Sequence, residues 1–207
     1  TETTLDQFDK FCKETGRDTV LAFGWGRGNR PAVMTTWAGA AAYCNWLSDK
    51  EKISKYYSIK GEEVTALDTA KGYRLPTEAE WEFAARGGIR KKDTTWYSGS
   101  NNLGEVGWWK DNSDERTHPV AQKKPNELGL FDMNGNVWEW VGDWYGFYWN
   151  DTEEDPDGAA GGRERVIRGG SFATGPMSLR SAHRRSSVVA AHYQTVGFRV
   201  ALSLDAP

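Results

Sequence analysis

The side chains best suited to nucleophilic or metal chemistry are few and widely spaced in this chain. There are two cysteines, Cys12 and Cys44, and three histidines. Two cysteines cannot form a disulfide framework, so the cysteine content does not indicate a redox compartment. Cys44 ends the pattern Trp37-x-x-Ala40-Ala41-x-x-Cys44, which has the spacing of an apolar helix face. We therefore expect Cys44 to be a small buried hydrophobe and not a reactive thiol.

Two of the histidines, His183 and His192, stand apart from any acid that could share a metal. No Asp or Glu lies between residues 165 and 204. Isolated histidines are more often surface residues or core hydrogen-bonding groups than ligands. Residues 150–162 are acidic and glycine-rich. They could bind a cation, but a solvated loop is the interpretation that we favour.

The elements that must position such residues are short. Residues 36–48 have the alanine content and the i, i+3, i+4 apolar spacing of a helix. Thr77 and Glu80 form a capping-box pattern, which predicts that a second helix begins directly after Thr77. Trp138 and Trp140 alternate as on one face of a strand. Residues 197–202 are predicted to form the closing strand.

Composition predicts a loop-rich fold. Eleven tryptophans, eight tyrosines and eight phenylalanines accompany 23 glycines in 207 residues, a mixture that suits tight turns between large buried side chains. Residues 1–30 end in a glycine-rich run and are interpreted as a turn-rich lead-in. No linker, internal repeat or run of 18 apolar residues divides the chain. We therefore predict one domain over residues 1–207 and no membrane-spanning segment.

Charge argues against one class of partner. The net charge of −3 gives no support for nucleic acid as a ligand. The charge is uneven, because residues 163–207 hold seven arginines, no lysine and only two acids. We expect these arginines to pair with acids elsewhere in the same fold.

Four segments follow one another in an order that points to a known family. They are GYRLPTEAEWE at 72–82, NGNVWEW at 134–140, RGGSF at 168–172 and GFR at 197–199. These segments resemble those of the formylglycine-generating enzymes, also called sulfatase-modifying factors, and residues 42–47 resemble that family's first helix. The resemblance extends from about residue 31 to residue 202. It implies an α+β, C-type-lectin-like fold with two helices around a small twisted antiparallel sheet.

The resemblance does not extend to the family's catalytic chemistry. Those enzymes hold copper with a pair of cysteines just after RGGS, whereas residues 171–184 contain no cysteine here. Soft-metal chemistry needs thiolate, which the hydroxyls of Thr174, Ser178 and Ser181 do not replace at neutral pH. We therefore expect no copper and no oxidase activity. A relative with other, non-copper oxidoreductase or accessory chemistry is the alternative.

The family also carries calcium. The resemblance assigns one site to the side chains of Asp132 and Glu139 and to the backbone carbonyls of Gly135 and Val137. Such hard oxygen donors suit calcium; the alternative is that the two carboxylates bind loop amides. At the family's second calcium site this sequence has Ala121 and Lys123. Because an ammonium group opposes a divalent cation, we expect that site to be absent.

Residues 172–196, which we call the C-terminal segment, have an unusual composition. The 25 residues FATGPMSLRSAHRRSSVVAAHYQTV contain no Asp, Glu, Lys, Asn or Trp, although the rest of the chain is rich in all five. A surface loop would ordinarily carry some of these residues. Chance combined with a partly buried path is the simpler explanation.

The C-terminal segment also resembles the variable region of retroelement-diversified proteins, including treponemal variable proteins, which use the same scaffold and end in a constant GFR. Randomised adenines in Asn codons reach nearly all of its residue types, with Met177 and Gln194 as exceptions. This resemblance implies a bacterial surface protein whose varied side chains contact an extracellular protein ligand of unknown identity. The candidate contact residues are Phe172, Ala173, Thr174, Gly175, Ser178, His183, Ser186, Ser187, Val188, Ala190, His192, Tyr193 and Thr195.

Three functions therefore compete. The first is ligand binding by the C-terminal segment without catalysis, and the second is the non-copper enzyme. The third, glycan binding, rests on analogy of fold alone. We favour the first, with calcium as the one structural cofactor and a monomer as the oligomeric state. Membrane attachment is expected only through a lipid anchor outside these residues.

Overall fold

The computed structural model describes residues 1–61, 63–67, 71–90, 95–147 and 158–202. The helices in that part are α1 (Leu5–Thr15), α2 (Trp37–Glu51), α3 (Glu78–Ala85) and α4 (Leu103–Val106), with 3-10 turns η1 (Gly88–Arg90) and η2 (Pro176–Leu179). The sequence predicts α2 and α3 only. None of the described helices is long and apolar enough to cross a membrane. Most of residues 150–162, the acidic stretch, lies outside the described residues.

The main sheet is mixed, with the strand order β6-β5-β4-β7. Its strands are β4 (Trp138–Trp144), β5 (Glu164–Arg168), β6 (Arg184–Val188) and β7 (Val196–Phe198). Strand β5 runs antiparallel to β4 and β6, but β7 runs parallel to β4. The fold is α+β as predicted, whereas the prediction of a purely antiparallel sheet is wrong. The chain does not turn back in a hairpin after β6; it crosses to the far side of β4, and β7 therefore keeps the direction of β6.

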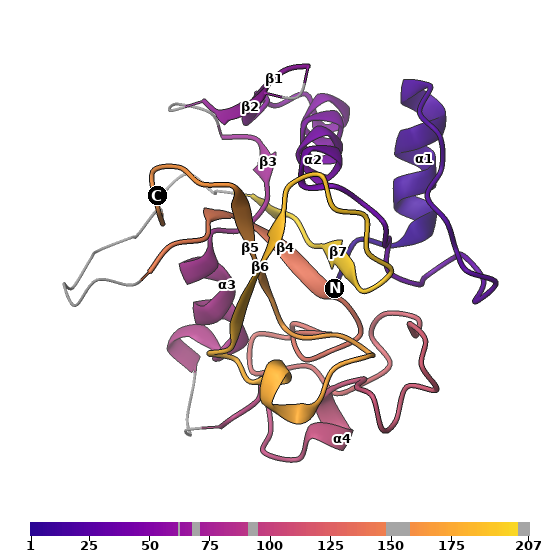
Figure 1. The fold of residues 1–207 in the computed structure, drawn as a ribbon, viewed down its shortest axis with the longest axis vertical. Helices are drawn as coiled ribbons and strands as arrows, with labels where there is room; N and C mark the ends of the chain where they lie inside the picture. Colours follow the sequence, from indigo (N-terminus) through magenta and orange to yellow (C-terminus); the bar gives the residue numbers. More distant parts are fainter. Residues whose placement is uncertain (62, 68–70, 91–94, 148–157, 203–207) are drawn as a thin grey trace.

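Two small sheets flank the main one. Strands β1 (Tyr57–Lys60) and β2 (Glu63–Ala66) form a hairpin, and β3 (Tyr73–Arg74) pairs with β8 (Ala201–Leu202). The predicted closing strand is thus divided between β7 and β8, which belong to different sheets. Figure 1 shows the main sheet in the middle of the molecule, with α1 and α2 together at one end and η2 and α4 in the loop-rich other end.

Helix α1 corrects the expectation of a turn-rich lead-in. Thr4 and Gln7 form a capping box, and the helix ends at Gly16 in the left-handed conformation. Buried Phe8 and Phe11 face the rest of the protein. The i, i+3 spacing of these aromatics and the capping pair were present in the sequence, so a local signal for this helix existed.

Helix α3 begins as its sequence predicts. Thr77 N donates to Glu80 Oε2 at 2.9 Å, and Glu80 N donates to Thr77 Oγ1 at 3.1 Å. Glu80 also receives two hydrogen bonds from the Arg74 guanidinium, at 2.5 and 2.6 Å. This carboxylate therefore satisfies the amide at the helix start and fixes strand β3 to the helix.

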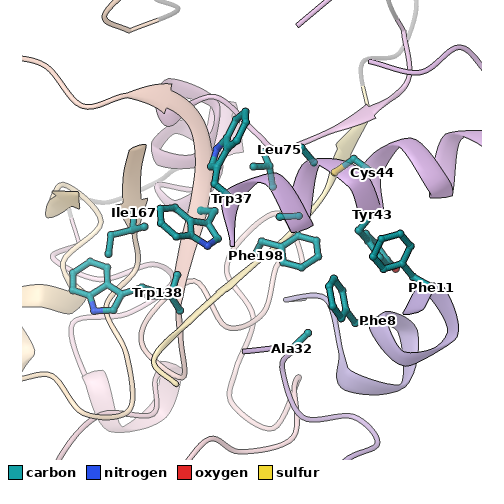
Figure 2. Close-up of a cluster of buried hydrophobic side chains, with 14 of the residues drawn as sticks. Phe8, Phe11, Ala32, Trp37, Tyr43, Cys44, Leu75, Trp138, Ile167 and Phe198 are labelled. Atoms are coloured by element: carbon teal, nitrogen blue, oxygen red, sulfur yellow. The ribbon is translucent and has the colours of Figure 1, made fainter. Parts of the chain in front are cut away.

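Aromatic side chains fill the core between the first two helices and the main sheet (Figure 2). Tyr43 of α2 lies 5.8 Å from Phe8 and 5.3 Å from Phe198, measured between ring centroids. Several buried indoles keep a polar partner: Trp37 Nε1 donates to the Val141 carbonyl at 2.8 Å, and Trp140 Nε1 donates to the Thr35 carbonyl at 2.9 Å. A satisfied N–H group removes the main cost of burying a tryptophan.

The RGGS segment forms a sharp turn after β5. Gly169 and Gly170 have φ angles of +92° and +79°. A Cβ atom on Gly170 would lie 2.8 Å from Leu179 Cδ1 and 3.0 Å from the Ser178 carbonyl. The glycine therefore lets η2 fold back against the turn, with Leu179 fully buried beside it.

This contact predicts that Gly170→Ala destabilises the protein by about 2–4 kcal/mol, since it combines a left-handed alanine with overpacking. Gly175→Ala is the matched control, because a Cβ there meets only Lys110 Cε at 3.8 Å and the residue has an extended backbone. Urea unfolding of both variants measures the difference. Equal stability of the two variants would contradict the close packing at Gly170.

Candidate functional site

The C-terminal segment begins and ends beside strand β4. Phe172 N donates to the Asn136 carbonyl, and Trp138 N donates to the Thr195 carbonyl, both at 2.8 Å. Between these two points the chain forms η2, the edge strand β6 and the turn before β7. The segment is therefore a long excursion whose two ends meet on the same part of the scaffold.

The scaffold holds this excursion at several points through backbone atoms. Ser181 N donates to the Trp96 carbonyl at 3.1 Å. Three carbonyls of the segment accept hydrogen bonds from backbone amides elsewhere: Thr174 from Lys110 (3.2 Å), Val189 from Trp37 (3.3 Å) and Tyr193 from Met34 (3.0 Å). Every residue type offers the same backbone N–H and C=O groups, except that proline has no N–H to donate. These contacts therefore survive substitution of the side chains that they support.

A buried guanidinium ties the segment to α3. Arg168 is fully buried, and its Nη2 donates to the Ser181 carbonyl at 2.7 Å and to Glu82 Oε2 at 2.6 Å. Its Nη1 donates to Glu78 Oε1 at 3.1 Å. Arg184 adds two hydrogen bonds to Glu78, at 2.8 and 2.6 Å. The expected pairing of the C-terminal arginines with distant acids is confirmed at these two positions.

The prediction of ligand contact is wrong for two residues, Phe172 and Ser187, because their side chains lie in the interior. Phe172 is 2% exposed and lies edge-on to Trp25, with 5.4 Å between ring centroids. Ser187 is buried in β6, opposite Arg165 of β5. Side chains alternate between the two faces of a strand, so the neighbours of Ser187 face outward while Ser187 itself faces inward.

The other predicted contact residues reach the surface to differing degrees. Val188 and Tyr193 are 47% and 50% exposed. Ala173, Ala190 and His192 are also exposed, and the half-buried residues are Thr174, Gly175, Ser178, His183, Ser186 and Thr195. Four further residues of the segment are exposed but are not among the predicted contact residues: Met177, Ala182, Arg185 and Gln194.

Some of these polar side chains already have partners within the chain. Ser171 N donates to Thr174 Oγ1 at 2.9 Å, and Ser186 Oγ donates to Glu164 Oε2 at 2.6 Å. His192 Nδ1 lies 3.0 Å from the Met34 carbonyl. A ligand that used these three groups would have to displace or share those contacts, whereas Val188 and Tyr193 are open.

His183 lies in a positive environment. Its ring is 5.9 Å from that of Trp138, measured between centroids. Burial lowers the pKa of His183, and the charges of Arg168, Arg185 and Arg180 lower it further. His183 is therefore neutral near pH 7 and available as a hydrogen-bonding group, in surroundings that favour an approaching anion.

The proposed calcium ligands are only partly free. Glu139 is fully buried and accepts from Arg199 Nε and Nη2, both at 2.6 Å, and from Trp81 Nε1 at 2.7 Å. Asp132 Oδ2 accepts from Ala121 N at 2.8 Å, but its Oδ1 is buried without a hydrogen-bond partner. In the described part of the chain no three His, Cys, Asp or Glu side chains converge on a metal position. Backbone carbonyls would have to complete any such site.

Charge around Asp132 is unbalanced. Glu2, Asp132 and Glu139 are all buried, with Arg199 as the guanidinium between them. Burial raises the pKa of Glu2 well above its usual range, and the nearby carboxylates Asp132 and Glu139 add to that shift. Burial also raises the pKa of Asp132. The unpartnered Asp132 oxygen and this excess of carboxylates fit a cation, while Glu139 is already engaged by Arg199.

At the position of the second calcium site, the lysine has another role. Lys123 Nζ donates to the Gly104 carbonyl at 2.8 Å and lies 3.9 Å from the centroid of the Trp108 ring. The ammonium group therefore stabilises the loop between α4 and β4 by a hydrogen bond and a cation–π contact.

Neither cysteine is placed for the family's copper chemistry. Both are buried free thiols, Cys12 in α1 and Cys44 in α2. Burial raises the pKa of both, that of Cys44 far above its usual range. A buried protonated thiol is a poor metal ligand and a poor nucleophile, and the segment after RGGS has no cysteine to assist it.

Helices and a twisted mixed sheet, with a loop-rich C-terminal excursion between RGGS and GFR, define a C-type-lectin-like domain of the formylglycine-generating-enzyme type. The chain belongs to the sulfatase-modifying factor enzyme 1-like domain family, whose family model matches residues 1–204. The match begins earlier than residue 31 because α1, which the sequence motifs did not reveal, is part of the domain.

Known relatives fall into different functional groups. Treponema denticola variable protein 1 has a similar structure, with a TM-score of 0.83 and 32% identity over 97% of this chain and 82% of that one. The formylglycine-generating enzyme of Streptomyces coelicolor is 33% identical over 87% of this chain and 55% of that protein. The chaperone protein LppX of Paenibacillus barcinonensis is 41% identical over 56% of this chain and 52% of its own length. The chain thus spans about half the length of these two sequence relatives.

The division of the C-terminal segment into buried and open positions predicts very different effects of two side-chain truncations on stability. Phe172→Ala should cost about 3–5 kcal/mol of stability, because it leaves a cavity under Trp25. Tyr193→Ala should change stability by less than about 0.5 kcal/mol, as is usual for an exposed side chain. Denaturant unfolding of both variants tests this. A large loss in Tyr193→Ala would mean that the turn before β7 is structural.

Proposed function

We propose that this chain is a receptor-like binding protein that presents varied side chains of the C-terminal segment to an external protein ligand, without catalysis. The observation that carries the proposal is the backbone attachment of the segment. Its carbonyls at Thr174, Val189, Tyr193 and Thr195 are held by amides of the scaffold. Side chains at the surface can then differ while the loop keeps its path.

The chemistry of the open positions supports this use. Tyr193 offers a large amphipathic ring with few rotatable bonds, and small residues such as Ala173 and Ala190 are also exposed in the segment. Antibody paratopes combine the same two kinds of side chain. The similarity to a treponemal variable protein supports the scaffold role. We place the ligand outside the cell, because diversified contacts are useful where ligands change.

The similarity to formylglycine-generating enzymes favours a second candidate, an enzyme or enzyme accessory that works without copper. The chain belongs to the same domain family as those enzymes, and its RGGS segment resembles theirs. The segment after this turn has Thr174, Ser178 and Ser181 but no cysteine, so any such activity would need other reactive groups. Binding therefore remains the function that this site supports better.

We also propose that one calcium ion is bound beside Asp132, with carbonyl donors from Gly135 and Val137 and with Glu139 close by. Calcium would neutralise the excess of buried carboxylates and use the unpartnered Asp132 Oδ1. Its role would be structural, since it would fix the loop that leads into β4.

The binding proposal predicts a genetic signature. The locus should hold a reverse transcriptase and a near-copy of the sequence that encodes residues 172–199, with mismatches at template adenines. Among isolates, variation should fall on open positions such as Val188, Ala190 and Tyr193 and should spare buried Phe172 and Leu179. Sequencing the locus in several isolates measures both features.

Two outcomes would contradict that prediction. An unchanging C-terminal segment without a template copy would remove the basis for varied contacts. Variation concentrated at Phe172 and Leu179 would mean that the buried and open positions have been assigned the wrong roles. Oxygen consumption by the purified protein, together with an unchanging segment, would favour the enzyme.

The calcium proposal predicts a thermal shift. Calcium at about 100 times its Kd adds roughly 2.7 kcal/mol of stability, which corresponds to a Tm increase of about 5–10 °C for a domain of this size. Thermal unfolding in calcium, in magnesium and in EDTA measures it. Asp132→Asn should abolish the shift, and Asp114→Asn, at an exposed acid, should retain it. Identical Tm values in calcium and EDTA would exclude a structural calcium ion.

A further inference from the structure

An open groove of about 320 Å³ lies next to the C-terminal segment. It is lined by Arg86, Thr95, Trp96, Arg180 and Ala182. These residues come from the end of α3, from the loop before α4 and from the stretch between η2 and β6. The groove thus combines scaffold residues with residues of the segment, and neither part forms it alone.

Arg180 is positioned by an aromatic ring and not by an acid. Its guanidinium carbon lies 4.3 Å from the centroid of the Trp96 ring, and the Ser181 amide donates to the Trp96 carbonyl, which fixes the two chains together. Within the described residues the Arg180 side chain has no carboxylate in an ion pair. Stacking occupies one face of a guanidinium and leaves its N–H edge free for an acceptor.

Two acids of α3, the helix that ends at the groove, are already shared. Glu82 Oε1 accepts from Arg86 at 2.7 Å, and its Oε2 accepts from Arg168 at 2.6 Å. Glu78 pairs with both Arg168 and Arg184. The three guanidiniums therefore share these two carboxylates. The Glu127 carboxylate also lies close by, beside Gly87, but within the described residues it forms no ion pair with Arg180.

Arg180 and Arg185 add further positive charge. Their charges, after the larger effect of burial, lower the pKa of His183, which lies three residues after Arg180 and two residues before Arg185. Trp96 is 57% exposed, so an apolar surface lies beside the unpaired cation. A carboxylate next to an apolar or aromatic group would match both features.

We propose that this groove is an anchoring site for an acidic side chain of a protein ligand, with Arg180 binding the carboxylate and Trp96 contacting the neighbouring residue. The inference rests on the proposed binding function and names the chemistry of its partner. Arg86 and Trp96 belong to the scaffold, and Arg180, although it lies in the C-terminal segment, is not among the candidate contact residues. The anchor would therefore stay the same while open positions such as Val188 and Tyr193 select among ligands.

A pair of short peptides tests the chemistry directly. The probes are acetyl-Gly-Glu-Tyr-Glu-Gly-amide and the same peptide with Gln in place of both Glu residues. Each is titrated into the full chain while the indole N–H signal of Trp96, identified with Trp96→Phe, is followed by NMR. The acidic peptide should shift this signal and bind at least about ten-fold more tightly than the neutral one, with an affinity that falls as salt rises.

Matched arginine variants separate the groove from general charge attraction. Arg180→Ala should weaken binding of the acidic peptide about ten-fold, as expected for the loss of a charged hydrogen-bonding partner. Arg163→Ala removes the same charge at an exposed position outside the groove lining and should change affinity less than about two-fold. Thermal unfolding checks that both variants remain folded.

Three results would each overturn the inference. They are equal affinity for the acidic and neutral peptides, equal losses of affinity in the two arginine variants, and no shift of the Trp96 signal. The titration extends to roughly 10 mM peptide, a concentration that covers weak millimolar binding. These results are distinguishable from failure of the binding function itself. The locus could prove unvaried while the groove still binds the acidic peptide, and a varied segment could accompany an inactive groove.

Discussion

The fully buried guanidinium of Arg168 is the contact on which the C-terminal half of the molecule depends. It lies at the end of β5 and reaches Glu78 and Glu82 of α3 as well as the Ser181 carbonyl. A charge in the interior needs acids and carbonyls as partners, and here both terminal nitrogens have them while Nε does not. This one side chain therefore joins the sheet, the helix and the C-terminal segment, in addition to the backbone contacts of the segment, and loss of both acids would leave an uncompensated charge.

Much of the scaffold follows from local signals in the sequence. The capping pair Thr77 and Glu80 marks the start of α3, and the apolar spacing of residues 36–48 marks α2, although that helix continues to Glu51. Helix α1 shows that such signals can be present and overlooked, because Thr4 and Gln7 form an equally good box. The parallel pairing of β7 with β4 has no local signal. It is decided by where the chain crosses after β6, which is a property of the whole fold.

The candidate site, like the scaffold, is predictable from the sequence only in part. Composition alone separates residues 172–196 from the rest of the chain, but it cannot separate Phe172, which fills the core, from Tyr193, which is open. That distinction depends on packing against Trp25 and on strand register. The stacking of Arg180 on Trp96 was equally invisible, since the two residues are distant in sequence and neither belongs to a recognisable motif. The role of a residue that depends on its tertiary neighbours cannot be predicted from local sequence patterns.

The closed shape of the C-terminal segment has a consequence for its length. Its first and last anchors, at Asn136 and Trp138, are two residues apart on the scaffold. For a loop whose ends are fixed together, doubling the number of residues costs only about 0.6 kcal/mol of closure entropy. The turn between β6 and β7 could therefore accept inserted residues as readily as exchanged ones. The domain offers a frame in which the reach of the loop, and not only its chemistry, can be altered.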